Sequence, residues 1–524
     1  MNFIPSQNRH QMWMSSLESS VEQDNAVRLI DACVDRLDLV KLKFRVRELK
    51  KEGRPAFESI VFLKLYFYGY LNGLRSSRRL ERECFRNIEL QWLMGGLKPN
   101  YHSIADFRKH NPLALRNTFK LFVLFLKDSD LVSGKIVAVD GTKVRANNSK
   151  KNNYNEKKIE RHLNYIENKT AEYLADLDRM DAKERKEFPD RVKAVKKKIL
   201  QLKENKIKYE ALGDMMADDN EPQISTTEPD SRALLVQGQV VEVCYNVQAA
   251  VDSEHSLVVA TRVINRNDRN ALSDIALEAK SNLSCDEMTI LADKGYQNGR
   301  EISECVKAGI STIVATPEIV NSNEGGTTEA FMVDKFVYNE GNDTYTCLAG
   351  HTLRTHGTWH TKKRTSRAQP HRYKKYRTSE CKSCSLRDLC TSRAKGGREV
   401  ERSEYGEELD QNKHRYENGR ALYRKRQEIN EHIFGTIKRQ WGYSYTPLRG
   451  LKNVNGEISF IMTIYNFKRF MNVWTYEDFL NRIKNWKPDY SKIRLTLLIN
   501  YYYISILRAP KYFSVIGHRK LGMS

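Results

Sequence analysis

The chain has 524 residues, too many for one compact hydrophobic core, so several domains are expected. Its formal net charge of +22 and pI near 9.4 favour a polyanionic partner, most simply nucleic acid, although a charge surplus also serves solubility. The sequence has no uninterrupted apolar run of roughly eighteen residues and no signal-peptide pattern at its start, so a cytoplasmic rather than a membrane or secreted protein is expected.

Residues 18–130 are expected to form an all-α domain, because apolar residues recur at helical intervals within this stretch. Ser76 precedes a charged helical stretch, and Ser103 stands three residues before Asp106, so each serine is a candidate helix N-cap. Several short basic helices could form a helix-turn-helix-like DNA reader. A helical bundle whose charges are only solvated explains the pattern equally well.

Two short apolar runs each lead to an aspartate. The run 135–139 is β-branched and bounded by glycines, which predicts a buried strand ending at Asp140; the run 288–292 ends in the same way at Asp293. Hard Mg²⁺ takes oxygen ligands and is usually held by only a few protein carboxylates. The two aspartates therefore predict a divalent-metal site at strand ends, and leave open where a third carboxylate comes from.

Residues 131–316 predict an α/β fold with a mixed sheet. Within them, 150–215 carries two narrow apolar stripes separated by Phe188-Pro189, which predicts an inserted antiparallel helical hairpin, either a DNA-facing arm or a solvated coiled coil. Two strand-like runs flank the polar turn 252–255 and predict a β-hairpin. The expected elements are strands at 240–251, 257–264, 288–292 and 311–315, with helices at 271–283 and 298–308.

Residues 317–415 form a basic insertion that contains four of the nine cysteines, Cys347, Cys381, Cys384 and Cys390. A CxxC with two further cysteines fits a four-thiolate zinc site, with His351 as an alternative ligand, and free thiols are an equally good interpretation. The odd, mostly scattered set argues against a disulfide framework. The stretch 372–377 interleaves aromatics with cations, which suits phosphate contact and base stacking.

Residues 416–475 begin with a strong helical pattern that carries Glu431. Glu431 and Lys438 are seven residues apart and are expected to share one helix face, while Phe434 and Ile437 are available to anchor the helix to the sheet. A glutamate on a helix is usually exposed to solvent. On this helix, Glu431 is nevertheless a candidate third carboxylate beside Asp140 and Asp293.

These motifs resemble those of a DDE transposase of a bacterial insertion sequence, in the large group with a ribonuclease-H-like core and a Y-R-E-K signature around the catalytic glutamate. The resemblance extends over roughly residues 20–470. It rests on Val139-Asp140-Gly141-Thr142, on Ala292-Asp293-Lys294-Gly295-Tyr296, and on Tyr423-x-x-Arg426 followed by Glu431 to Arg439.

The resemblance implies that Asp140, Asp293 and Glu431 are the catalytic triad and bind Mg²⁺ or Mn²⁺. It also implies DNA contacts, made by Tyr423, Arg426, Lys438 and Arg439. One departure is visible: four residues separate Arg426 from Glu431, where the signature has three, so Arg424 is an alternative to Arg426.

The function expected from this resemblance is metal-dependent DNA cleavage and strand transfer of an insertion sequence. The expected partner is double-stranded DNA, both element ends and target, bound by a homodimer, without a membrane and without a nucleotide cofactor, since no GxxxxGK[ST] pattern occurs. The expected location is the bacterial cytoplasm, at the nucleoid. A metal-dependent nuclease on the same core and an inactive DNA-binding relative are the alternatives. No role follows for the tail, 476–524.

Overall fold

The computed structural model describes residues 10, 14–45, 55–180, 188–218, 221–236, 240–317, 327–362, 370–393 and 396–493. The expected tail is therefore described only as far as residue 493, and the rest of it lies outside the described residues. None of the helices in these ranges combines the length and the apolar character needed to cross a lipid bilayer.

The N-terminal region is helical, as expected. Its helices are α1 (Ala26–Asp35), α2 (Ser59–Leu71), α3 (Ser77–Arg86), α4 (Ile88–Leu93), α5 (Tyr101–His110) and α6 (Pro112–Asp128). Ser76 is the N-cap of α3, although its side chain makes no capping hydrogen bond among the described residues. The Ser103 prediction is wrong: Asn100 caps α5 and its side chain accepts from Ser103 N at 2.9 Å, because asparagine is at least as good an N-cap and comes first along the chain.

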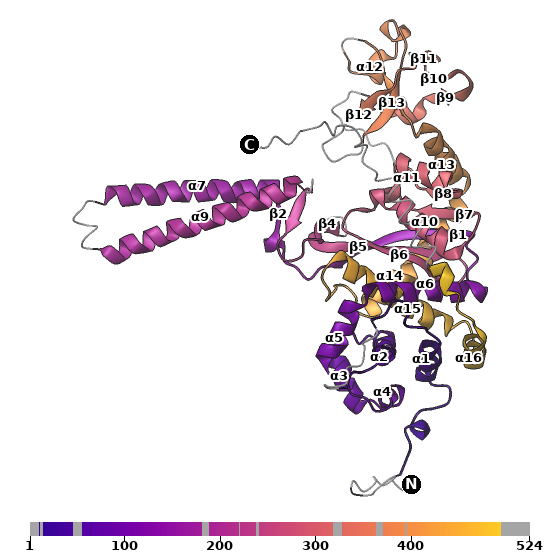
Figure 1. The fold of residues 1–524 in the computed structure, drawn as a ribbon. Helices are drawn as coiled ribbons and strands as arrows, with labels where there is room; N and C mark the ends of the chain where they lie inside the picture. Colours follow the sequence, from indigo (N-terminus) through magenta and orange to yellow (C-terminus); the bar gives the residue numbers. More distant parts are fainter. Residues whose placement is uncertain are drawn as a thin grey trace, which may run out of the picture.

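A mixed six-stranded sheet forms the centre of the molecule (Figure 1). Its strands are β1 (Ile136–Arg145), β4 (Arg232–Val236), β5 (Val240–Asp252), β6 (Val258–Ile264), β7 (Met288–Ala292) and β8 (Ile310–Val314). The order is β4-β5-β1-β7-β8, with β6 also paired to β5. β1, β7 and β8 are parallel, while β5 is antiparallel to β1 and forms the predicted hairpin with β6.

The sequence missed two features of this sheet. β4 lies in a stretch for which the sequence predicts no strand, since the strands expected after the helical hairpin begin at residue 240. β1 does not end at Asp140 but continues to Arg145, because its antiparallel pairing with β5 runs to Arg145↔Cys244. What ends near Asp140 is the parallel pairing with β7, whose last pair is Val139↔Ala292.

Helices lie on both sides of the sheet, with α10 above it and α15 below it as drawn (Figure 1). Outside the helical hairpin and the basic insertion, the helices that follow β1 are α10 (Leu272–Leu283), α11 (Gly299–Lys307), α13 (Gly406–Asn418), α14 (Arg420–Gly435), α15 (Leu451–Phe470) and α16 (Tyr476–Asn485). A π-helical turn, Thr436–Gln440, continues α14. One hydrophobic cluster joins the sheet, α15 and the N-terminal helices, so these parts share a core.

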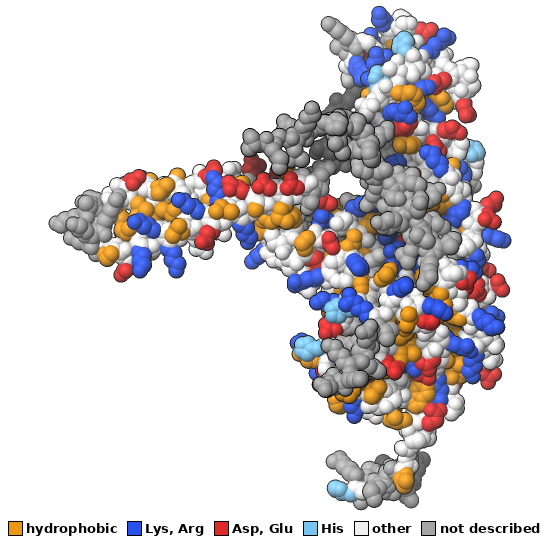
Figure 2. Space-filling view, in the orientation of Figure 1, with side chains coloured by type: hydrophobic (Ala, Val, Ile, Leu, Met, Phe, Trp, Pro, Cys, Tyr) orange, Lys and Arg blue, Asp and Glu red, His pale blue; other side chains and the backbone are white. Residues whose placement is uncertain are grey.

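The inserted hairpin is present and projects from the body as an arm (Figure 1). It consists of α7 (Glu156–Arg179) and α9 (Pro189–Asp218), closed at its base by the short strands β2 (Asn153–Asn155) and β3 (Gln223–Ser225). Blue and red side chains alternate along its visible face with apolar ones between them (Figure 2). A DNA-facing role for this arm stays a prediction.

The basic insertion forms a second, smaller six-stranded sheet at the opposite end from the N-terminal helices (Figure 1). Its elements are β9 (Val337–Asn339), β10 (Thr344–Thr346), β11 (Thr352–Thr355), β12 (His360–Lys362), β13 (His371–Arg377), α12 (Arg387–Cys390) and β14 (Val400–Ser403). All of its pairings are antiparallel.

A buried ion pair connects the N-terminal helices to α15. Arg108 Nη1 of α5 lies 2.7 Å from Glu457 Oε1 of α15, and the two side chains are 7% and 0% exposed. The hydroxyl of Tyr70 also donates to Glu457, at 2.9 Å. Removing one partner of such a pair leaves an uncompensated buried charge, which costs more than the pair contributes.

Glu457→Ala is therefore expected to lower the free energy of unfolding by about 3–5 kcal/mol, measured by urea denaturation. Glu477→Ala, at an exposed position of α16, is the control and should change it by less than about 0.5 kcal/mol. If both substitutions lowered the free energy of unfolding equally, Glu457 would not stabilise the contact between the N-terminal helices and α15.

Candidate active site

Asp140 and Asp293 lie side by side on neighbouring parallel strands. The last parallel pair of β1 and β7 is Val139↔Ala292, and each aspartate is the residue that follows its member of this pair. Asp293 caps the short helical turn Lys294–Tyr296, where its Oδ1 accepts from Gly295 N at 2.9 Å. The rigid sheet thus places two carboxylates at one edge, as the sequence predicted.

Beyond Asp140, the edge of β1 is taken over by the segment that follows α14. Arg145 N donates to Ser444 O at 3.0 Å, and Thr446 N donates to Arg145 O at 2.9 Å. The Lys438 ammonium donates to Lys143 O at 2.9 Å and to Thr142 Oγ1 at 3.1 Å. These contacts hold α14 and its π-helical turn beside Asp140 and close the rest of the β1 edge.

The carboxyl of Asp140 is partly buried and surrounded by opposing charges. Burial raises its pKa above the ordinary value, and the charges of Asp293 and Asp268 act in the same direction. The Gly141 N–H, which donates to Asp140 Oδ1 at 2.7 Å, and the Arg426 guanidinium, 3.5 Å from Oδ2, act against this shift. The site therefore favours a cation beside Asp140.

A third aspartate, Asp268, stands close to this pair and has no sequence motif that could have identified it. Its carboxylate accepts from Asn246 and Gln248 at 2.8 Å and pairs with Lys143 at 2.8 Å. Burial opposes ionisation, yet these hydrogen bonds hold the pKa of Asp268 below its ordinary value. Because its oxygens are already used by these donors, Asp268 holds β1 and β5 together beside the site.

This network also reaches the short helical turn that follows Asp293. The Tyr296 hydroxyl donates to the side-chain oxygen of Gln248, whose amide nitrogen donates to Asp268. A Cβ at Gly141 would lie 2.6 Å from Asp268 Oδ1, so only glycine fits between Asp140 and this network. Gly141 and Tyr296, both part of the sequence motifs, therefore serve to bring the strands and the turn together.

α14 presents Arg426 and Asn430, one turn apart, toward the sheet. Arg426 pairs with Asp140, and its guanidinium lies 5.6 Å from the ring centre of Tyr423. Asn430 is buried, and neither its amide oxygen nor its amide nitrogen has a hydrogen-bond partner among the described residues; the same holds for Arg426 Nε. Buried polar groups without a partner are costly, so an ion or solvent molecule that bonds to these groups would be stabilising.

Glu431 is exposed, and its carboxylate accepts from Gln427 at 2.7 Å on the same helix. Arg439 is exposed as well. The shared face expected for Glu431 and Lys438 rests on regular α-helical spacing, and the π-helical turn that begins at Thr436 breaks this spacing between them. Across the ranges that the structure describes, no three histidine, cysteine or acidic side chains stand where one metal ion could bind them all.

The residues that are present fit a hard divalent cation in their chemistry. Asp140 and Asp293 supply carboxylate oxygens, and the amide oxygen of Asn430 is a buried acceptor without a partner in the described part of the chain. Two carboxylates and an amide oxygen are the donor types that Mg²⁺ accepts. The described residues place no third carboxylate with free oxygens beside these donors, since Asp268 is already bonded to Asn246, Gln248 and Lys143.

Two family models match the chain. Residues 15–110 match a transposase domain (DUF772), and residues 346–471 match a transposase DDE domain. The second match includes most of the cysteine insertion, α14 with Glu431, and α15, whereas Asp140 and Asp293 precede it. Comparison with curated proteins gave no match, and comparison with solved structures gave none either.

The raised pKa of Asp140 predicts a stability effect. A carboxyl whose pKa is higher in the folded protein binds its proton more tightly there, so its ionisation at neutral pH disfavours folding. Asp140→Asn should therefore raise the melting temperature at pH 7 without metal, and the gain should shrink as the pH falls toward 3.8. Asp286→Asn, an exposed position before β7, should change it little at either pH. A variant less stable than wild type at pH 7 would contradict this account of Asp140.

Proposed function

We propose that this protein, a phosphodiester-cleaving transposase with a DDE domain, excises an insertion sequence and joins its ends to target DNA. The observation that carries the proposal is the placement of Asp140 and Asp293 at the same edge of neighbouring parallel strands, directly beside α14. The mixed sheet, with β1 between an antiparallel and a parallel neighbour, supports a ribonuclease-H-like core.

Asp140, Asp293 and Glu431 would hold Mg²⁺ or Mn²⁺, which when bound activates the nucleophile and stabilises the leaving oxygen. The positions of Asp140 and Asp293, each directly after the last parallel pair of β1 and β7, support this role. Arg426 neutralises Asp140 in the protein alone, and a scissile phosphate competes for the same guanidinium because arginine binds phosphate in a bidentate manner. Binding of DNA and release of Asp140 from Arg426 would therefore be coupled.

Glu431 reaches the site through a one-residue change in the register of α14. Asn430, immediately before it, already occupies the sheet-facing position and is left without hydrogen bonds among the described residues. The π-helical turn at Thr436–Gln440 shows that one extra residue is accommodated in this helix. Moving that extra residue to the N-terminal side of Glu431 would place its carboxylate where Asn430 now lies.

The remaining signature residues suit contacts with DNA phosphates. Lys438 lies beside β1, where burial lowers the pKa of its ammonium, and its two present partners are a hydroxyl and a backbone carbonyl rather than a carboxylate. Arg439 is exposed next to it, and Tyr423 supports Arg426. These side chains flank the aspartate pair, where the strand being cut would lie.

The partners follow from the reaction. Double-stranded DNA supplies both the element ends and the target, and a net charge of +22 favours its binding. Two ends must be processed together, which favours a homodimer assembled on DNA. The reaction is a transesterification and requires no nucleotide cofactor. We place the protein in the bacterial cytoplasm, at the nucleoid.

The test is an excision assay with the purified protein and a plasmid that carries the element ends. Excised and joined products should form with Mg²⁺ and be absent with EDTA. Asp140→Ala should reduce both products below detection while its affinity for end DNA stays within about twofold, because the carboxylate serves chemistry rather than binding. Asp286→Asn is the matched control and should keep wild-type activity.

Three other outcomes of the excision assay would contradict the proposal. Nicked products without joining would identify a metal-dependent nuclease on the same core. A mobility shift without cleavage would leave a DNA-binding protein. Cleavage retained by Asp140→Ala would remove Asp140 from the catalytic site even if the protein proves to be a transposase.

A further inference from the structure

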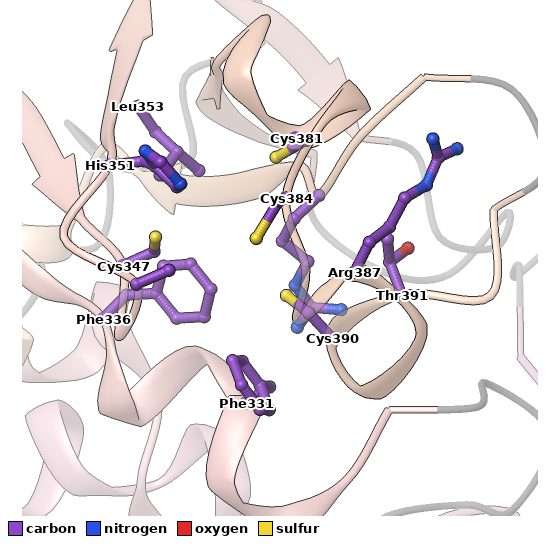
Figure 3. Close-up of a pocket in the computed structure, with 12 residues that line it drawn as sticks. Phe331, Phe336, Cys347, His351, Leu353, Cys381, Cys384, Arg387, Cys390 and Thr391 are labelled. Atoms are coloured by element: carbon purple, nitrogen blue, oxygen red, sulfur yellow. The ribbon is translucent and has the colours of Figure 1, made fainter.

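Four cysteines of the small sheet domain surround one cavity. Cys347 follows β10, Cys381 and Cys384 lie in the turn after β13, and Cys390 is the last residue of α12. Figure 3 shows the sulfurs of the last three facing Cys347 across a common space. The cavity has a volume of about 20 Å³, room for one guest the size of a water molecule or an ion.

The backbone around this cavity is shaped to hold the four thiols close together. Residues 347–350 form a tight turn in which Gly350 N donates to Cys347 O at 2.9 Å, and Gly350 has a φ of 79°, which favours glycine. On the other side, a Cβ at Gly397 would overlap the side chain of Cys381. Two positions that favour glycine, on two separate segments, thus allow the cysteines to come close together.

The thiols are not paired with each other, since all nine cysteines of the chain are free. Four thiols around one cavity, with no disulfide between them, are a ligand set for structural zinc, because Zn²⁺ takes thiolate sulfur readily and is usually held by four tetrahedral ligands.

One positive side chain stands where the excess charge of a zinc–thiolate group would be. Four thiolates and one Zn²⁺ carry a net charge of −2, and Arg398 lines the cavity, whereas the side chain of Arg387 points away from the sulfurs (Figure 3). The Nε of Arg398 is buried and has no hydrogen-bond partner among the described residues. A thiolate ligand would accept a hydrogen bond from this N–H.

The domain also has little else to stabilise it. Its hydrophobic core consists of five buried side chains, Phe336, Tyr345, Leu353, Tyr376 and Val400. Cys347 and Cys390 pack directly against this cluster. Domains of this size usually need a metal or disulfides because they bury too little apolar surface.

We propose that Cys347, Cys381, Cys384 and Cys390 bind one structural Zn²⁺ as four thiolates, and that this ion holds the turn after β10 against α12. The binding step is Zn²⁺ plus four Cys–SH giving a tetrathiolate complex of charge −2 and four protons. Among the described residues, no three of these side chains are close enough to bind one metal ion together. Binding therefore requires the cysteine side chains to change rotamer so that their sulfurs turn toward the ion.

His351 lines the same cavity, and its Nδ1 pairs with Glu380 Oε2 at 2.8 Å. Because four thiolates already complete the tetrahedral coordination of Zn²⁺, His351 is left to this pair. This pair links the turn that follows Cys347 to the one that holds Cys381.

The test measures zinc in the full-length protein, purified without chelators, by plasma mass spectrometry. About one zinc per chain is expected, with complete loss in Cys381→Ser/Cys384→Ser and retention in Cys285→Ser, a partly exposed cysteine outside this domain. His351→Ala should keep its zinc, and loss there would overturn the four-thiolate set. Wild-type protein without zinc, or a double variant that retains it, would overturn the proposal.

A second measurement uses wild-type protein alone, so it stands even if the double variant fails to fold. Exchange of the bound metal for Co²⁺ should give the visible absorption bands of tetrahedral cobalt and a sulfur-to-cobalt charge-transfer band. Octahedral cobalt bands would overturn the proposal. Alkylation of the denatured, unreduced protein in the presence of chelator should modify all four thiols, whereas protected cysteines would indicate disulfides in place of zinc.

Discussion

The central constraint on this protein is the point where two parallel strands stop pairing. β1 and β7 are hydrogen-bonded up to Val139 and Ala292, and the next residue on each strand is an aspartate. A central sheet is rigid, so these two carboxylates have a fixed separation and share one edge. Asp268, Lys143 and Gln248 secure the strands around them, and the segment after α14 closes the remainder of the β1 edge.

Neighbouring cations offset the repulsion between the carboxylates of Asp140 and Asp293. Burial and the charge of Asp293 both disfavour ionisation of Asp140. In the protein alone, Arg426 lies 3.5 Å from Asp140 and reduces that repulsion. In the proposed catalytic complex, divalent metal does so and Arg426 is left for phosphate. A bound cation is also proposed in the small sheet domain, where four cysteines surround one cavity.

The sequence predicts the sheet well because its strands are short apolar runs bounded by glycines and polar turns. It predicts the positions of Asp140 and Asp293 for the same reason, although β1 runs past Asp140, since pairing with β5 is a long-range contact. Asp268 has no motif, because its partners come from β1 and β5 and meet only in the fold. The orientation of Glu431 was equally hidden, because a single π-helical turn changes which face a residue occupies.

The central claim is that a carboxylate at the sheet-facing position of α14 completes the site. The direct measurement is DNA cleavage by three variants. Glu431→Gln should abolish cleavage, and adding Asn430→Glu to it should restore at least part, because Asn430 already faces the sheet. Adding Gln427→Glu instead, a carboxylate on the exposed side, should restore nothing. Full activity in Glu431→Gln, or equal rescue by both additions, would contradict the account.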